Sequence, residues 1–387
     1  MAEFGPVTCA GCGLLCDDVT VDAAGADVAV KPECRLGAKW FSERMVRAAS
    51  APAATIDGEP ADVESALVRA AELLRGARRP LLHGFTGATV EDARAAVALA
   101  DRLGALVSTG VAAGPWAGGP AVPLRGASTA TLGEIRDRSR LVVIWREDPE
   151  STHPRLLERL GFAGALRSGR TLVVIDERDT ATGQRADVQL RWARENDLDL
   201  LSSLHMLLRG LTPRSVCASD ELLALIERLR GVAHAAIVHG AGLSAGAGGQ
   251  RRALALHELV RALCQERHVV TLELPGAPGT RSADDVLAWQ SGYGGNVDFG
   301  GGHPELVPAG QAFDDVDVRL RVESGPAGSV VSGPGVEVWI RTAAAGVEAS
   351  GTAHRLDGVP LSLQAPRPGD APTAAAVLRR LLGEVGR

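Results

Sequence analysis

The sequence lacks any apolar run of the roughly 18 residues that a membrane-spanning helix requires. Its N-terminus has no basic segment followed by an apolar core, so no secretory signal is expected. It also lacks an excess of positive charge, because 41 lysine and arginine residues face 47 aspartate and glutamate residues, giving a net charge of -6. Such a balance argues against binding to nucleic acid or to an anionic membrane surface. We therefore expect a cytoplasmic protein.

Cysteine is scarce, but the six cysteines of the 387-residue chain are unevenly distributed. Four of them fall within the first 34 residues, in a C-x2-C-x3-C run followed by one later thiol, and these are Cys9, Cys12, Cys16 and Cys34. Gly11 and Gly13 let the backbone turn tightly and keep amide N–H groups available to sulfur. Thiolates at this density predict a [4Fe–4S] cluster or a structural zinc ion. The alternative is a set of small buried residues, which the scarcity of cysteine elsewhere disfavours. A reducing cytoplasm disfavours disulfide bonds.

The length and the pattern of apolar residues predict an α/β protein with more than one domain. Residues 1–50 are expected to form a small Cys-rich, iron–sulfur-type module with short strands at 19–21 and 27–30. Beyond it, strands and helices alternate, which is typical of parallel sheets covered by helices. We predict two Rossmann-like parallel-sheet domains, one of which is discontinuous. The discontinuous α/β domain covers 51–130 and 276–387, and the inserted Rossmann-like domain covers 131–275.

The expected elements follow from apolar runs and helical periodicity. Strands are predicted at 80–85, 105–108, 141–145, 171–176, 188–192, 234–238, 268–274, 316–322 and 336–340. Helices are predicted at 62–75, 89–103, 153–160, 197–208, 250–264 and 374–382. Thr89 is expected to cap the second of these helices, with Asp92 three residues later.

Five stretches of the sequence resemble one known family. They are Cys9–Asp18, Cys34–Phe41, Leu141–Trp145 with Pro149 and His153–Arg155, Val286–Tyr293 with Val297–Phe299, and Gly351–Pro360. On these stretches the chain resembles, nearly end to end, the B subunits of the formylmethanofuran dehydrogenases, a branch of the molybdopterin oxidoreductases. The resemblance implies an iron–sulfur domain and two Rossmann-like domains around a bis-pterin molybdenum or tungsten centre. It also implies partner subunits, because members of this family lack the C-terminal barrel of larger relatives.

The sequence departs from the family at the loop that holds the metal. Redox members carry Cys-His-Gly there, whereas this chain reads Val111-Ala112-Ala113-Gly114-Pro115. An alanine methyl group neither coordinates a metal nor moves a proton. The catalytic redox ligands are therefore predicted to be lost at Ala112 and Ala113, and no molybdopterin or tungstopterin is expected.

A vestigial pterin cleft is predicted from six residues, which are Arg146, Asp148, Asp176, Gly240, Gly242 and Trp289. The family's Gly-x-Asn-Pro turn is replaced by Arg146-Glu-Asp-Pro149. A carboxylate about 4 Å from a pyrophosphate would cost roughly 4 kcal/mol at an effective dielectric constant near 20, which Arg146 would partly offset.

Four of these six residues have an alternative interpretation. The turn containing Gly240 and Gly242 suits a phosphate group, but it also suits the ordinary packing of a Rossmann-like unit. Asp176 is placed like a ribose acceptor or is simply a polar strand end. Trp289 lines the old cleft or a partner surface, or packs in the core.

Without these redox ligands, the sequence resembles the B-type subunit of a bacterial formyltransferase/hydrolase complex. That complex transfers a formyl group from tetrahydromethanopterin to a furan carrier and hydrolyses it to formate. The resemblance predicts a non-redox structural subunit without its own catalytic centre. Its expected partners are an amidohydrolase-like formyl hydrolase subunit, a formyltransferase subunit, a further small family subunit and a methanofuran-type carrier. The alternatives are an active molybdenum or tungsten formylmethanofuran dehydrogenase subunit that interconverts CO2 and the formyl carrier, or a protein that binds another nucleotide-like ligand.

Overall fold

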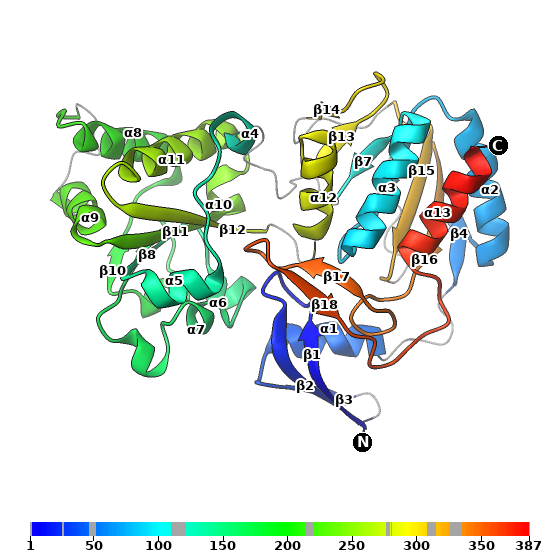
Figure 1. The fold of residues 1–387 in the computed structure, drawn as a ribbon, viewed down its shortest axis with the longest axis horizontal. Coiled ribbons are helices and arrows are strands. Elements are labelled where there is room, and N and C mark those ends of the chain that lie inside the picture. Colours follow the sequence, from blue (N-terminus) through cyan, green and yellow to red (C-terminus); the bar gives the residue numbers. More distant parts are fainter. Residues whose placement is uncertain are drawn as a thin grey trace. The chain divides into compact units, whose positions relative to one another are not determined.

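The computed structural model describes residues 2–24, 27–45, 52–109, 121–213, 220–275, 279, 281–307, 315–325 and 335–386. The chain divides into two compact units, each with its own sheet and core (Figure 1). Unit 1 comprises Met1–Trp116 and Ala277–Arg387, and unit 2 comprises Ala117–Gly276. The domain limits predicted above, including a separate module at 1–50, stay predictions. Among the described residues, no helix has both the length and the apolarity needed to cross a bilayer.

Unit 1 begins with a small antiparallel sheet in the order β1-β2-β3. Its elements are β1 (Ala2–Cys9), β2 (Cys16–Ala24), β3 (Asp27–Lys31) and the following helix α1 (Arg35–Met45). The register places Cys9 opposite Cys16, so the intervening turn carries Cys12. The strands predicted at 19–21 and 27–30 are confirmed, whereas β1 was not predicted.

The cysteine-bearing turn packs against a hairpin from the far end of the chain. This hairpin consists of β17 (Gly351–His354) and β18 (Pro360–Leu363). The Leu356 N–H donates to the Gly13 carbonyl over 2.8 Å, and the Thr8 N–H donates to Gln364 Oε1 over 2.8 Å. The bond between Leu356 and Gly13 therefore directly joins two regions that resemble the same family.

The large sheet of unit 1 has eight strands in the order β14-β13-β7-β6-β15-β16-β4-β5. In that order they are Glu305–Leu306, Asn296–Asp298, Leu106–Ser108, Pro80–His83, Val318–Glu323, Val336–Arg341, Ala54–Ile56 and Glu59–Ala61. The four central strands are parallel, and the two at each edge are antiparallel. The sheet is therefore mixed, not parallel as predicted.

The antiparallel hairpin at one edge arises because a short turn joins its strands in place of a crossover helix. Asp57 and Gly58, with φ of 50° and 86°, form the two-residue turn between β4 and β5. An Asp-Gly pair at positive φ is a strong hairpin signal, but this hairpin was not predicted from the sequence.

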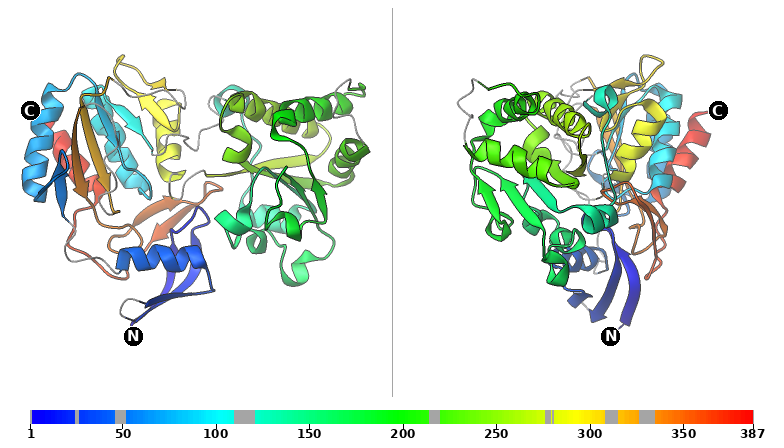
Figure 2. Two further views of the ribbon diagram at one scale, coloured as in Figure 1. Left: turned by 180° about the vertical axis from the view of Figure 1, so that it is seen from behind. Right: turned by 60° about the vertical axis from the view of Figure 1, so that its left-hand side comes forward.

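Four helices of unit 1 share one hydrophobic core with this sheet (Figure 2). They are α2 (Val63–Gly76), α3 (Val90–Leu103), α12 (Arg281–Ser291) and α13 (Ala374–Val385). Thr89 caps α3 in a capping box with Asp92, as predicted. Asp92 also accepts a hydrogen bond from the Ala375 N–H at the start of α13, so one buried carboxylate ties two helices together.

Unit 2 contains a five-stranded, wholly parallel sheet in the order β10-β9-β8-β11-β12. In that order the strands are Val188–Leu190, Thr171–Ile175, Leu141–Trp145, His234–Gly240 and His268–Leu274. One face packs in a common core with α8 (Asp197–Leu208), α9 (Asp220–Gly231) and α11 (Gly249–Leu263). Every residue of β8 is buried, as its continuous apolar run predicts for a strand of a parallel sheet covered on both faces.

The remaining helices of unit 2 are short. They are α4 (Ala121–Arg125), α5 (Leu132–Arg138), α6 (Pro149–Thr152), α7 (Leu156–Arg159), α10 (Ala241–Ser244) and the 3-10 helices Gly164–Arg167, Gly183–Arg185 and Arg194–Asn196. The helix predicted at 153–160 is shorter than expected. Pro154 disfavours helical backbone at His153, so α6 and α7 are separate turns.

Candidate functional site

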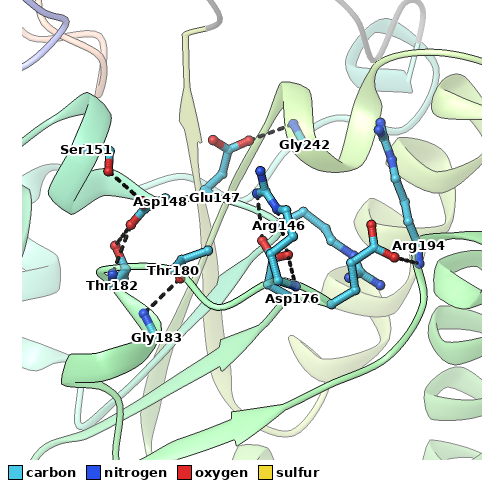
Figure 3. A network of polar contacts seen from close by, with 12 residues as sticks. Arg146, Glu147, Asp148, Ser151, Asp176, Thr180, Thr182, Gly183, Arg194 and Gly242 are labelled. Atoms are coloured by element: carbon cyan, nitrogen blue, oxygen red, sulfur yellow. Dashed lines mark hydrogen bonds and ion pairs between the residues drawn. The ribbon is translucent and has the colours of Figure 1, made fainter.

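The carboxyl edge of the unit 2 sheet gathers most of the predicted cleft. Parallel strands end at the same edge, so the residues after β8, β9 and β11 lie close together (Figure 3). Five of the six predicted cleft residues are found here, namely Arg146, Asp148, Asp176, Gly240 and Gly242. The sixth, Trp289, belongs to helix α12 of unit 1.

Arg146 is committed to a buried ion pair. Its backbone adopts a left-handed conformation with φ of 58° directly after β8. Its guanidinium Nε and Nη2 donate to Asp197 over 2.9 Å each, and the two side chains are only 3% and 0% exposed. Trp145 Nε1 donates to the same carboxylate over 2.9 Å. Asp197 was not among the predicted site residues, yet it accepts both Nε and Nη2 of Arg146, which was predicted to offset the acidic turn. The buried Nη1 of Arg146 has no hydrogen-bond partner among the described residues.

Glu147, also absent from the predicted site residues, faces the glycine turn. Its Oε1 accepts the Gly242 N–H over 2.7 Å, as Figure 3 shows. Burial raises the pKa of Glu147 to about 7, although the Gly242 hydrogen bond and the charge of Arg178 act in the opposite direction. The glycine turn thus holds a carboxylate that belongs to the chain itself.

Asp148 is bound elsewhere. Its Oδ1 accepts the Thr182 N–H over 2.9 Å, and its Oδ2 accepts the Ser151 hydroxyl over 2.6 Å. Burial works to raise the pKa of Asp148, but the hydrogen bonds from Ser151 and Thr182 bring it below its ordinary value. Asp148 therefore stays ionised and joins the end of β8 to the loop after β9.

Asp176 is paired at both carboxylate oxygens. Its Oδ1 accepts the backbone N–H and Nε of Arg178 over 2.9 and 3.0 Å, and its Oδ2 accepts Nη2 over 2.9 Å. Burial opposes ionisation, but these bonds lower the pKa of Asp176 below its ordinary value. This arrangement matches the interpretation of Asp176 as a polar strand end.

The two glycines of the turn are required by the packing of the chain on itself. A Cβ added at Gly242 would lie 1.8 Å from the carbonyl oxygen of Arg146. A Cβ added at Gly240 would lie 2.7 Å from the Leu274 carbonyl oxygen and 2.8 Å from Glu147 Oε1. The alternative of ordinary Rossmann-like packing therefore accounts for both glycines without a ligand.

The cysteines of unit 1 form a second candidate site. Cys9, Cys12 and Cys16 are buried, Cys34 is half-buried, and none of the described cysteines is in a disulfide bond. Burial raises the pKa of the Cys9 thiol to about 12, and the charges of the other three thiols raise it further, against the Gly11 N–H 3.4 Å away. The four thiols are thus near enough to influence one another electrostatically.

The groups around Cys9 are chemically suited to a metal bound by sulfur. A Cβ added at Gly11 or Gly37 would lie 3.4 or 3.3 Å from Cys9 Sγ, so bare backbone lines the sulfur. Among the described residues, however, no three or more His, Cys, Asp or Glu side chains are already arranged around one metal position. Binding would require thiol deprotonation and closer convergence of the four side chains. Cys264 lies apart in unit 2, and Cys217 lies outside the described residues.

Trp289 lies on the surface of unit 1 with 56% of its area exposed, so it is not a core residue. Its ring meets the edge of His354 at a centroid distance of 5.7 Å. This ring contact brings the family-like stretches 286–293 and 351–360 together, and His354 Nδ1 also lies 2.8 Å from Asp285 Oδ2. The loop that contains Ala112 and Ala113 lies outside the described residues.

Comparison with known proteins extends over nearly the whole chain. No family model matches the sequence. The chain is 26% identical over 406 residues to the B subunit of tungsten-containing formylmethanofuran dehydrogenase 2 from Methanocaldococcus jannaschii, covering 92% of each protein. It is 25% identical over 411 residues to the B subunit of the enzyme of the same name from Methanococcus maripaludis, covering 94% of each.

A solved structure is similar as well. It is a chain of the formyltransferase/hydrolase complex (FhcABCD) from Methylorubrum extorquens, crystallised in complex with methylofuran, with a TM-score of 0.69 and 26% identity. The match covers 86% of the present chain and 98% of the other. Over nearly its whole length the chain is thus similar to formylmethanofuran dehydrogenase B subunits. The family resemblance inferred from the five sequence stretches is thereby confirmed.

Proposed function

We propose that this B-subunit homologue is a non-redox structural subunit of a formyltransferase/hydrolase complex in tetrahydromethanopterin-linked one-carbon metabolism. It positions an amidohydrolase-like formyl hydrolase subunit, a formyltransferase subunit and a further small family subunit, which together serve a methanofuran-type carrier. The similarity to a chain of the FhcABCD complex, solved with methylofuran, supports this role.

The observation that carries the proposal is the identity of residues 112 and 113. Both are alanine at the position where redox members of the family place Cys and His. A molybdenum or tungsten centre needs a soft protein ligand there, and an alanine methyl group has no lone pair to donate. The subunit therefore has no metal-centred reaction of its own.

The packing at the edge of the unit 2 sheet supports the absence of a pterin. Gly242 lies so close to the Arg146 carbonyl that any side chain at position 242 would clash with it, so packing alone accounts for this glycine. Arg146 is paired with Asp197, and the Gly242 N–H is taken by Glu147. Arg146 Nε and Nη2 and the Gly242 N–H are therefore engaged within the chain, whereas the buried Arg146 Nη1 has no hydrogen-bond partner in the described part of the chain.

The four N-terminal thiols are proposed to hold a [4Fe–4S] cluster or a zinc ion that stabilises the module. When bound, such a metal cross-links β1, β2 and the start of α1, because its ligands lie in or beside all three. With no redox centre beyond it, the site serves structure and not electron transfer.

Purification of the native complex tests this function. We expect co-purification of a formyltransferase and an amidohydrolase, with molybdenum and tungsten near zero per chain by mass spectrometry of metals. A visible absorption band bleached by dithionite identifies the cluster, and stoichiometric zinc without that band identifies the zinc site. Molybdenum or tungsten near one atom per chain would overturn the proposal.

The second candidate function is an active formylmethanofuran dehydrogenase subunit. It is favoured by the similarity to two tungsten-containing enzymes over more than nine-tenths of each chain. The same metal analysis decides between the two, because only the dehydrogenase requires the heavy metal.

A further inference from the structure

The amino edge of the unit 2 sheet, opposite the glycine turn, gathers arginine residues. Parallel strands begin at the same edge, so the residues that precede β8 and β9, Arg140 and Arg170, lie beside each other. The Thr171 N–H donates to the Arg140 carbonyl over 2.8 Å, and the Arg140 N–H donates to the His234 carbonyl at the start of β11 over 3.2 Å. The starts of three neighbouring strands therefore form one continuous surface.

Arg170 carries a buried positive charge that is paired with no carboxylate of the described residues. It is 7% exposed, and its guanidinium donates only to backbone carbonyl oxygens, among them that of Leu166 over 2.8 Å. Burial lowers the pKa of Arg170, the charges of Arg140 and Arg136 lower it further, and Asp137 acts in the opposite direction. Positive charge therefore outweighs negative charge around Arg170.

Helix α5 contributes two carboxylates to this edge, but each is paired with an arginine of the same helix. Asp137 Oδ1 lies 2.8 Å from Arg136 Nε, and Glu134 Oε1 lies 2.9 Å from Arg138 Nη1. Arg140 is exposed and has no carboxylate partner in the described part of the chain. An excess of positive charge therefore remains at the starts of β8 and β9, although the whole chain has a net charge of -6.

An exposed apolar turn lies beside this charge. The 3-10 helix Gly164–Arg167 has no buried residue, and Leu166 is 52% exposed. Hydrogen bonds hold the turn in place, because Arg170 Nε donates to the Leu166 carbonyl and Arg167 Nη1 donates to the Arg170 carbonyl over 2.6 Å. A fixed apolar side chain among arginines suits a protein partner, since arginine is enriched in protein interfaces and a preformed turn loses little entropy on binding.

We propose that Arg140, Arg170 and Leu166 form the centre of a docking surface for an acidic face of a partner subunit. Carboxylates of the partner lie over the arginines, and Leu166 enters an apolar hollow between them. The net charge of the chain disfavours nucleic acid, because the whole molecule repels a phosphate backbone, whereas a protein partner needs negative charge only at the contact. The inference rests on the proposed function in one respect, namely that the chain works beside partner subunits.

The test uses the full chain and the formyltransferase and amidohydrolase subunits that are expected to purify with it. The dissociation constant between the chain and these subunits is measured by biolayer interferometry in about 0.1 M and about 1 M sodium chloride. The affinity of the wild type is expected to fall as salt rises. Arg140→Glu is expected to weaken binding about tenfold or more at low salt, and Arg140→Lys, which keeps the charge, is expected to retain most of the affinity.

The matched control is Arg251→Glu. Arg251 is likewise an exposed arginine of unit 2, but it lies in the first turn of α11, at the opposite edge of the sheet. It is expected to bind like the wild type. Leu166→Asp is a second variant, and it is expected to weaken binding as Arg140→Glu does. Far-UV circular dichroism and the melting temperature check that each variant is folded, which the exposure of all three residues favours.

Four results would overturn the inference. The first three are wild-type affinity in both Arg140→Glu and Leu166→Asp, an equal loss in Arg251→Glu, and an affinity that does not respond to salt. The fourth is binding of the wild type to a DNA duplex that Arg140→Glu abolishes while subunit binding is unchanged.

Failure of the proposed function is seen separately, as molybdenum or tungsten in the native complex. A complex that holds the heavy metal and is weakened by Arg140→Glu refutes the proposed function alone. A complex that lacks the heavy metal and is unaffected by Arg140→Glu and Leu166→Asp refutes the inference alone.

Discussion

The glycine turn of unit 2 and the cysteine turn of unit 1 are both tight backbone turns that the sequence associates with a cofactor. Beside the glycine turn, two polar groups have partners within the chain, because Glu147 accepts the Gly242 N–H and Asp197 pairs with Arg146. In the cysteine turn, burial holds the pKa of Cys9 at about 12, so the thiol stays protonated unless a metal replaces the proton.

The two turns differ in whether their polar groups already have partners within the chain. In the glycine turn the Gly242 amide has a partner within the chain, so it needs no ligand to satisfy it. The cysteine turn keeps four sulfur donors and two bare glycines beside Cys9. We therefore expect the first site to be closed and the second to remain competent for metal.

The largest expected effect is at the cysteine turn. Cys9→Ser is expected to reduce bound iron or zinc from about one site per chain to near zero, because a hydroxyl is a far weaker ligand for these metals than a thiolate. Metal analysis after gel filtration measures this. Cys264→Ser, at an exposed cysteine of unit 2, is the control and should retain the metal. Unchanged metal content in Cys9→Ser would show that the module is not the metal site.

The second largest effect is expected on stability, at the buried ion pair between Arg146 and Asp197. Asp197→Asn leaves the buried guanidinium of Arg146 without its charge partner and is expected to lower the free energy of unfolding by about 3–5 kcal/mol. Asp179→Asn, in an exposed pair with Arg191, is expected to leave the free energy of unfolding nearly unchanged. Urea denaturation of both variants measures the contrast, and equal losses would contradict it.

A smaller loss is expected at the glycine turn. Gly242→Ala places a Cβ against the Arg146 carbonyl oxygen, which is backbone, so the strand ends must separate. A cost of about 3 kcal/mol is expected from overpacking. Gly231→Ala at the end of α9 meets no atom within 4 Å and should change stability by about 1 kcal/mol or less. A tolerated Gly242→Ala would indicate that the turn is more open than described.

The smallest expected effect is on the pH dependence of stability. The folded pKa of Glu147 is about 7, above its ordinary value of 4.5, so the folded state binds the proton more tightly. This contribution is fully present below pH 4.5 and is lost as the pH rises through 7. Glu147→Gln should flatten this part of the profile by on the order of 1–3 kcal/mol between pH 5 and pH 8. Identical profiles for the two proteins would contradict the raised pKa.

Sequence patterns predicted the strands of unit 2 well and the edges of unit 1 poorly, and helix α9 of unit 2 was not predicted. Apolar runs such as Leu141–Trp145 became buried parallel strands, because a strand covered on both faces needs apolar residues throughout. The strands β13, β17 and β18 are short and lack such runs, so they were missed. Their position depends on partners distant in sequence, which local pattern does not contain.

The sequence by itself indicated the resemblance to formylmethanofuran dehydrogenase B subunits, through five spaced stretches, and it placed at position 112 an alanine that cannot ligate a metal, since side-chain chemistry is a property of the residue alone. Only the tertiary structure decided which carboxylate faces the glycine turn. The left-handed backbone of Arg146 redirects the chain after β8, and Glu147 thereby meets Gly242, 95 residues away in sequence. Asp148, one residue further, bonds to Thr182 instead. Neighbouring residues of this loop point in different directions, and the folded backbone decides which of them faces the glycine turn.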